Sequence, residues 1–195
     1  MPTRERIAKV ERVLSKRQPD LHIVLEEVTN THNASAVVRT CDAAGVLNLD
    51  VIYAACEPFP VNEAISTRAE KWLNLSRYTS TRDCLLHLKE RGFTIAATHL
   101  GPEAVPYTDL DFTRPIAIVF GNESEGISRE ALEEADHAIH IPMSGMAQSL
   151  NLSVSVGIIL YEALRQRRLA GYCPSLSPEE FESFKKKWLN PHTDI

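Results

Sequence analysis

The feature that most constrains the fold is a regular alternation of short apolar runs with helical stretches. Apolar runs of strand length occupy residues 21–25, 49–54, 93–98, 115–120 and 138–141. Helical patterns lie between several of them, at 33–44, 81–91 and 128–135. Strands that alternate with helices usually form a parallel sheet with helices on its faces. The sequence therefore predicts an α/β fold built on a mainly parallel sheet.

The amino end is predicted to be a basic helical arm. Ile7, Val10 and Leu14 recur at helical spacing, and the amphipathic helix that they predict ends near Gln18-Pro19. We expect an arm over residues 1–18, followed by the sheet domain over residues 19–170.

The carboxyl end is predicted to be a second helical extension, over residues 171–195. A linker leads into Ser177-Pro178-Glu179-Glu180, a capping box with proline at the first helical position. Phe181, Phe184 and Trp188 share one face of the helix that follows. An apolar face of this kind predicts docking on the body of the protein or on a partner subunit.

Composition points to one globular domain without a membrane segment. The chain has 195 residues, of which 44% are hydrophobic and 24% charged, enough for one sizeable core. It contains no run of about 18 apolar residues and no signal-type amino terminus, so we expect a cytoplasmic protein. The four cysteines lack a CxxC pair and the seven histidines lack ligand spacing, so no metal site is expected.

Positive charge gathers toward both ends of a chain whose formal net charge is −5. Residues 1–17 hold six basic and two acidic side chains, and two further basic clusters lie at 165–168 and 185–187. This distribution could bind phosphates while the acidic interior carries out chemistry. Solvated helix faces carry similar charges, so charge alone leaves RNA binding open.

The common nucleotide and hydrolase motifs are absent. Gly121-Asn-Glu-Ser-Glu-Gly126 has the glycine spacing of a P-loop but continues with Ile127-Ser128, without the lysine that neutralises phosphates. The sequence also lacks GxGxxG, GxSxG and HExxH. Hydrolase and metalloenzyme interpretations therefore lose their support.

Three loops stand out where a predicted strand ends or a helix begins. The first is His32-Asn33-Ala34-Ser35, in which Asn33 could be only a helix cap. The glycines of the second, 121–126, indicate either a tight turn or close approach to a flat ligand. The third, 141–153, mixes methionines with polar groups before a long helix, where its members could be gap fillers or caps. Taken singly, each loop permits a structural role.

Together the loops resemble the SPOUT class of RNA methyltransferases (the TrmH/SpoU family), in particular the branch that methylates the ribose 2′-hydroxyl of guanosine 18 in tRNA. The matching segments are RQPDL (17–21), HNASAVVRTCDAAG (32–45), FGNESEG (120–126), IPMSGMAQSLNLSVS (141–155) and YEALRQRR (161–168). The resemblance implies a deep trefoil knot at about 116–165, S-adenosylmethionine bound by the knotted loops, and a homodimer with the active site at the subunit interface.

The resemblance also assigns roles to individual residues. The implied cofactor contacts are Leu100, Gly121, Ile141, Met146, Ser149 and Leu150. The implied catalytic residues are Arg39, Asn33, Glu123, Ser149 and Asn151, and the implied RNA contacts are Arg6, Arg12, Arg17, Arg165 and Arg167. A guanidinium is almost always protonated, so our hypothesis is that Arg39 and an RNA phosphate together take the 2′-hydroxyl proton.

Two segments depart from the pattern of the resembled branch. Arg68-Ala69-Glu70 stands where close relatives carry glycine, serine and often histidine, and Thr29-Asn30-Thr31 replaces an approach that contains proline. The alternatives that remain are a 2′-O-methyltransferase for another tRNA position or for rRNA, and a catalytically silent knotted RNA-binding protein. The intact catalytic set favours an enzyme.

Overall fold

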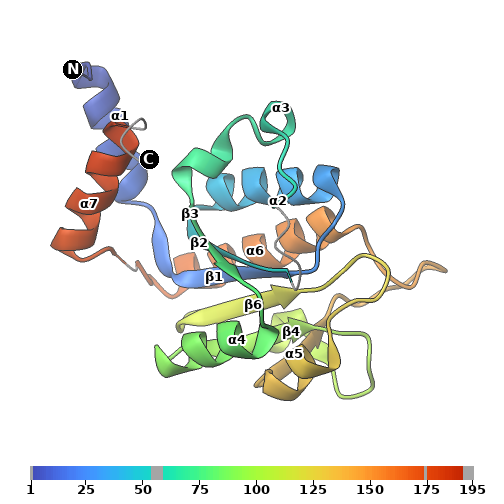
Figure 1. The fold of residues 1–195 in the computed structure, drawn as a ribbon. Coiled ribbons are helices and arrows are strands. Elements are labelled where there is room, and N and C mark those ends of the chain that lie inside the picture. Colours follow the sequence, from blue (N-terminus) through green and yellow to red (C-terminus); the bar gives the residue numbers. More distant parts are fainter. Residues whose placement is uncertain (1, 54–58, 174, 191–195) are drawn as a thin grey trace.

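The computed structural model describes residues 2–53, 59–173 and 175–190, and its centre is a parallel sheet with helices on both faces (Figure 1). The described part of the chain contributes seven strands in the order β3-β2-β1-β6-β4-β7-β5, and every pairing is parallel. The strands are β1 Gln18–Glu26, β2 Val46–Ile52, β3 Asn74–Tyr78, β4 Thr94–Thr98, β5 Val105–Pro106, β6 Ile116–Phe120 and β7 His137–His140. The predicted α/β fold is confirmed.

The helices divide between the two faces of the sheet. The α-helices are α1 Arg4–Leu14, α2 Thr31–Ala44, α3 Glu63–Ser66, α4 Thr81–Glu90, α5 Arg129–Glu134, α6 Leu152–Leu169 and α7 Pro178–Leu189, and the 3-10 helices are η1 Ala69–Trp72 and η2 Tyr107–Asp109. Helices α2 and α6 pack together on one face, and α4 packs with α5 on the other (Figure 1).

Alternation along the central strand supplies a hydrophobic core on each face. Ile23 and Leu25 of β1 join the core under α2 and α6, whereas Val24 joins the core under α4 and α5. All three side chains are fully buried, as expected for a strand in the middle of a sheet covered on both sides.

Two late strands lie between strands that precede them in the sequence. Strand β6 separates β1 from β4, and β7 separates β4 from β5. Because all of these strands are parallel, the loops that follow β4, β6 and β7 leave the same edge of the sheet side by side. This strand order gathers three distant loops at one place.

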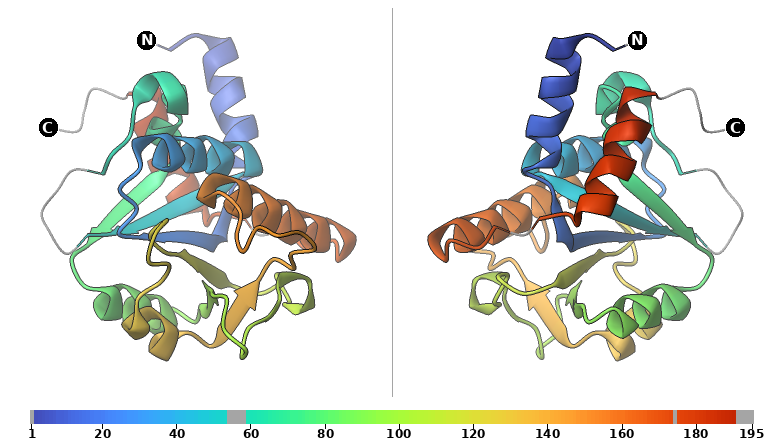
Figure 2. Two further views of the ribbon diagram at one scale, coloured as in Figure 1. Left: turned by 90° about the vertical axis from the view of Figure 1, so that its right-hand side faces the viewer. Right: turned by 90° about the vertical axis from the view of Figure 1, so that its left-hand side faces the viewer.

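The terminal helices pack against each other (Figure 2). Val10, Leu14, Leu47 and Trp188 form a small core between them and the body, with Phe181 and Phe184 against it. The predicted capping box is confirmed, since Ser177 and Glu180 exchange hydrogen bonds of 2.9 and 3.2 Å. The apolar face of α7 therefore docks on its own chain.

The amino-terminal helix is shorter than predicted. It ends at Leu14, and Gln18 already pairs with Val46 in the sheet. The sequence also gave no prediction for β3 or for the short strand β5. Strand β3 lies at the edge of the sheet, and its half-exposed sequence Asn-Leu-Ser-Arg-Tyr lacks an apolar run.

Candidate functional site

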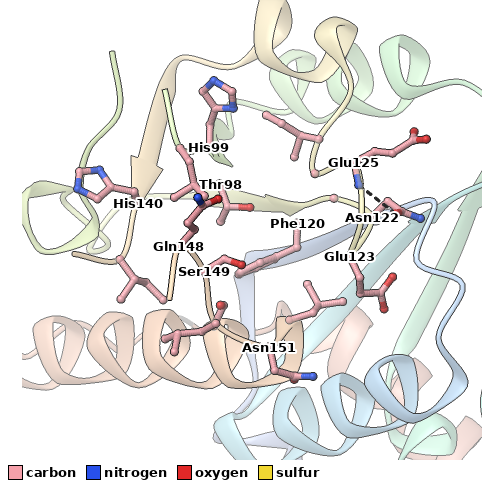
Figure 3. Close-up of a pocket in the computed structure, with 18 of the residues that line it drawn as sticks. Thr98, His99, Phe120, Asn122, Glu123, Glu125, His140, Gln148, Ser149 and Asn151 are labelled. Carbon is pink, nitrogen blue, oxygen red and sulfur yellow. Dashed lines mark hydrogen bonds between the residues drawn. The ribbon is translucent and has the colours of Figure 1, made fainter. Parts of the chain in front are cut away.

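A cavity of about 770 Å³ opens where β4, β6 and β7 end (Figure 3). Its walls come from the loops after those three strands, from the start of α2 and from the loop that leads into α6. Glu123 and Asn151 lie toward one end of the cavity, and His99 and His140 toward the other (Figure 3). Ligands of open parallel sheets bind in this kind of crevice, at the carboxyl ends of the strands.

Close backbone packing fixes the loop 121–126. A Cβ on Gly121 would lie 2.1 Å from the carbonyl carbon and oxygen of Gly126, so only glycine fits there. Gly126 has φ +75°, a left-handed conformation that favours glycine, and its N–H donates to the carbonyl of Asn122 at 2.8 Å. The close approach permitted by these glycines is thus between two parts of the same loop.

The end of β1 holds this loop on both sides. The side chain of Asn122 donates to the carbonyl of Glu27 at 2.8 Å. The buried carboxylate of Glu26 accepts from the Ser128 N–H at 2.8 Å and hydroxyl at 2.7 Å, and from the Thr81 hydroxyl at 2.6 Å. The sequence analysis missed Glu26, although a carboxylate that directly follows an apolar strand was a signal for it.

A chain of side-chain hydrogen bonds joins three of the predicted catalytic residues. Asn33 Nδ2 donates to Glu123 Oε1 at 2.9 Å, and Asn151 Nδ2 donates to Asn33 Oδ1 at 2.9 Å. Asn151 Oδ1 in turn accepts from the backbone of Ser153 at 2.9 Å and caps α6. The network orients the Glu123 carboxylate at the cavity wall.

Asn33 is free for this network because it does not cap its helix. The cap of α2 is Asn30, whose Oδ1 accepts from the Asn33 N–H at 3.1 Å. The interpretation of Asn33 as a helix cap is therefore wrong. Ser149, the fourth predicted catalytic residue near this network, also lines the cavity.

Most of the predicted cofactor contacts lie around the cavity. Leu100, Gly121, Ile141, Ser149 and Leu150 line it, and Met143 adds a wall residue that the sequence analysis did not name. Met146 does not line the cavity, because the exposed loop before α6 leaves its side chain fully in solvent. The structure therefore does not place the Met146 side chain in the cavity wall.

Arg39 lies away from the cavity, on the exposed side of α2. Six residues turn a helix by about 240° beyond one full turn, so Arg39 and Asn33 lie on different faces of α2. Within the described ranges, the Arg39 guanidinium has no hydrogen-bond or ion-pair partner. The Arg39 guanidinium is therefore free, and it does not line the cavity beside Glu123.

Arg17 is buried, which overturns its predicted role as an RNA contact. It is 1% exposed, forms an ion pair with Asp42 and donates to the carbonyl of Val46 at 3.0 Å. Its guanidinium also lies 5.1 Å from the ring centroid of Trp188. Arg17 therefore links the end of α2 and the start of β2 to α7. Its charge is not exposed to solvent.

The predicted role of Arg167 as an RNA contact is wrong for the same reason. It is 2% exposed and donates to Asp20 Oδ1 and to the carbonyl of Phe112, both at 2.7 Å. Its guanidinium lies 5.2 Å from the ring centroid of Tyr172, which donates to the same Asp20 carboxylate. A buried guanidinium with these partners is a structural residue, because exposing it would leave the mostly buried carboxylate of Asp20 without its cation.

The other three predicted RNA contacts remain accessible. Arg6 and Arg12 are exposed on α1, and Arg6 donates to the carbonyl of Trp188 at 3.3 Å. Arg165 is exposed on α6 and bonds both carboxylate oxygens of Glu162 at 2.7 Å. These hydrogen bonds lower the pKa of Glu162, which therefore stays ionised and competes with any phosphate for Arg165.

The described residues contain neither a membrane-spanning helix nor a cluster of metal ligands, and two of their cysteines are buried. None of the described helices is long and apolar enough to cross a membrane. No group of three or more potential ligands could hold a metal ion within the part of the chain that the structure describes. Cys41 and Cys84 are buried, and burial raises the pKa of Cys41 to about 12. Cys56 lies outside the described residues.

The cavity combines an apolar side with an oriented carboxylate. Leu100, Ile141 and Leu150 offer apolar surface beside the backbone of the 121–126 loop, while Glu123 and Glu125 add negative charge. Such a lining suits a flat heterocycle joined to a cationic group.

Comparisons with known proteins agree with this geometry. The chain is 47% identical to the tRNA (guanosine(18)-2′-O)-methyltransferase of Aquifex aeolicus over 186 residues, 94% of this chain and 88% of the relative. The crystal structure of an A. aeolicus TrmH/SpoU tRNA modifying enzyme superposes with a TM-score of 0.92 at 46% identity, covering 98% of each chain.

A more distant solved structure carries a cofactor. The SpoU methyltransferase AviRb from Streptomyces viridochromogenes, solved in complex with AdoMet, gives a TM-score of 0.67 at 27% identity, covering 80% of this chain and 64% of that one. Residues 20–161 match the SpoU rRNA methylase family over all three motif loops. With these motifs assembled around one cavity, the chain belongs to the SpoU methylase family.

Proposed function

We propose that this protein transfers a methyl group from S-adenosylmethionine to the ribose 2′-hydroxyl of guanosine 18 in tRNA. The observation that carries the proposal is the hydrogen-bonded set Asn33, Glu123 and Asn151 in the wall of the cavity. Similarity to tRNA (guanosine(18)-2′-O)-methyltransferases over 94% of the chain supports both the reaction and the substrate.

The cavity lining fits S-adenosylmethionine. Leu100, Ile141 and Leu150 would hold the adenine, and the backbone of the loop around Gly121 would supply polar partners. Glu123 and Glu125 would favour the positive charge of the sulfonium. When bound, S-adenosylmethionine supplies an electrophilic methyl group.

The side chains of the network would position the attacking ribose. Asn33 holds Glu123 Oε1, which leaves Oε2 able to accept a hydrogen bond from a ribose hydroxyl. Arg39 would pair with an RNA phosphate, and this pair would take the 2′-hydroxyl proton while the positive charge stabilises the developing alkoxide. Orientation of the hydroxyl can itself supply much of the rate.

Arg39 can take part only if a second subunit brings it to the cavity. We therefore propose a homodimer in which the Arg39 of each protomer completes the site of its partner. The exposed face of α6 carries an apolar stripe at Val154, Ile158 and Tyr161, and two of these residues are 48% and 56% exposed. Because α6 packs against α2, burying this stripe would bring the Arg39 face of α2 to the interface.

We also propose that the chain is knotted over about 116–165. The support is the strand order, since β6 and β7 each lie between strands that precede them. A knot would require the chain to thread through one of its own loops, which is a rare exception to normal topology.

Methyl transfer to unmodified tRNA transcripts tests the proposal directly. With labelled S-adenosylmethionine, we expect one 2′-O-methyl group per tRNA, mapped to guanosine 18 by resistance of the adjacent linkage to alkali. A transcript with 2′-deoxyguanosine at that position is the control and should accept no label. Label at another tRNA position or in rRNA would show that the substrate is a different nucleotide. No label on any RNA would contradict the enzyme assignment.

A further inference from the structure

Glu26 is a buried carboxylate that has no part in the reaction proposed above. It is the last residue of β1, it is 3% exposed, and its side chain lies on the face of the sheet that α4 and α5 cover. Within the described part of the chain no ion pair joins it to a cation, and Arg82 and Lys89 of α4 pair with Glu134 instead. A buried charge without a cation is unfavourable for stability, and such exceptions are found mainly at functional sites.

Three hydrogen bonds satisfy this carboxylate, and two of them come from one residue. Oε1 accepts from the hydroxyls of Thr81 and Ser128, and Oε2 accepts from the Ser128 N–H. An ionised carboxylate can accept all three bonds at once, because its two oxygens offer about four lone-pair sites. Glu26 is therefore chiefly an anchor for Ser128.

Ser128 directly follows the loop that forms part of the cavity wall. Gly126 and Ile127, the two residues before it, line the cavity. A Cβ on Gly121 would lie 2.2 Å from the backbone nitrogen of Ile127, so the position of this nitrogen limits where the Gly121 backbone can lie. The first half of the loop has its own hydrogen bond to the end of β1. The second half depends on Glu26.

We propose that Glu26 is a positioning residue for S-adenosylmethionine. Through Ser128 it holds the backbone of residues 121–127 in the conformation that binds the cofactor. The proposal rests on the proposed function, since it concerns the same cavity. Glu26 is buried and does not line the cavity, so it acts through the loop and does not touch the cofactor.

The first test is Glu26→Leu, which removes all three acceptors and leaves a side chain of similar size. The N–H of Ser128 then loses its partner, and the loop can leave its position. We expect S-adenosylmethionine to bind about tenfold more weakly or worse. Calorimetry measures the affinity, at a temperature where circular dichroism shows the variant to be folded. An affinity within twofold of wild type would overturn the proposal.

A matched pair of serine variants provides a second test that does not depend on the folding of Glu26→Leu. Ser128 caps α5 by accepting from the Ala131 N–H at 3.0 Å, and Ser80 caps α4 by accepting from the Asp83 N–H at 3.1 Å. Ser128→Ala and Ser80→Ala should therefore lower stability to a similar extent.

Only one of these two serines bonds to Glu26. We expect Ser128→Ala to weaken the binding of S-adenosylmethionine by about three- to tenfold, and Ser80→Ala to bind it like wild type. Equal affinities in the two variants would overturn the proposal, because Ser128 would then be an ordinary helix cap.

The double variant shows whether both residues act through one contact. Glu26→Leu with Ser128→Ala should bind S-adenosylmethionine no more weakly than Glu26→Leu alone, since the contact is already lost. Losses that add would overturn the proposal, because Glu26 would then act by another route. A wild-type protein that binds no S-adenosylmethionine would contradict the proposed function, whereas binding by wild type with no loss in any variant would contradict this inference alone.

Discussion

At the scale of single residues, Asn33 shows how one amide can serve two neighbours. Its Nδ2 donates to Glu123 and its Oδ1 accepts from Asn151, so neither an apolar nor an acidic side chain can replace both bonds.

We expect Asn33→Ala to lower kcat for methyl transfer by about 100-fold, because the carboxylate of Glu123 loses its orientation. Steady-state kinetics with tRNA measures the effect. The exposed neighbour His32 provides the control, since His32→Ala should keep wild-type turnover. Turnover of Asn33→Ala within twofold of wild type would remove Asn33 from the site.

Arg167 leads to a prediction about stability. Replacing it by alanine leaves the largely buried carboxylate of Asp20 without its cationic partner, which should cost about 3–5 kcal/mol in the free energy of unfolding. Urea denaturation measures this cost. The exposed Arg165, whose only ion-pair partner in the described chain is Glu162, should cost less than about 1 kcal/mol on the same change. Similar stabilities for the two variants would contradict the structural role of Arg167.

At the scale of elements, the sequence predicted the strands that the core demands and missed those at the edges. Strands β1, β2, β4 and β6 are rich in apolar residues because most of their residues are buried between the two helical layers. Strands β3 and β5 are at the two edges of the sheet, where half-exposed residues carry no strand pattern. The helix that follows Ser128 was predicted correctly because its cap is local.

The site was predictable where it depends on local sequence and unpredictable where it depends on distant partners. The three motif loops were identified, and the structure brings them to one cavity. The burial of Arg17 and Arg167 could not be inferred, because no spacing links them to Asp42 and Asp20. The exposure of Arg39 could not be predicted either, because which side of α2 faces solvent depends on how α2 packs against α6.

Loop 121–126 supports a prediction with a matched pair of glycine variants. Gly121→Ala places a Cβ 2.1 Å from backbone atoms of Gly126, so the loop must move and affinity for S-adenosylmethionine should fall by more than tenfold. Gly145→Ala adds the same methyl group with nothing within 4 Å and should bind normally. Calorimetry compares the two variants. Unchanged binding by Gly121→Ala would show that this loop does not hold the cofactor.

At the scale of the whole molecule, the proposed homodimer makes a prediction that mixing experiments can test. Arg39→Ala and Asn33→Ala should each retain only a few per cent of wild-type activity or less when alone, about 1% for Asn33→Ala. If Arg39 acts on the partner's cavity, a mixed dimer contains one site with both residues intact. An equimolar mixture, refolded together or co-expressed, should then recover about a quarter of wild-type activity for a two-fold dimer.

The control for this mixture is a single chain that carries both substitutions, mixed with an equal amount of Arg39→Ala. No dimer in that mixture has a site with both Arg39 and Asn33 intact, whether Arg39 comes from the same protomer or from its partner. Absence of recovery in the first mixture, with mixed dimers verified by tag capture, would mean that Arg39 serves its own protomer.

The order of strands in the sheet also sets when the protein can fold during its synthesis. Strands β1, β2 and β3 are neighbours and can pair as soon as they leave the ribosome. Strand β4 has no place beside them until β6 has been made, because β6 is the link between the two. The two halves of the sheet therefore stay apart until residues 116–120 have been made, and β7 at residues 137–140 then joins β4. Such late, non-local pairing is intrinsically slow, so the nascent chain exposes an unpaired edge of β1 until residues 116–120 have emerged.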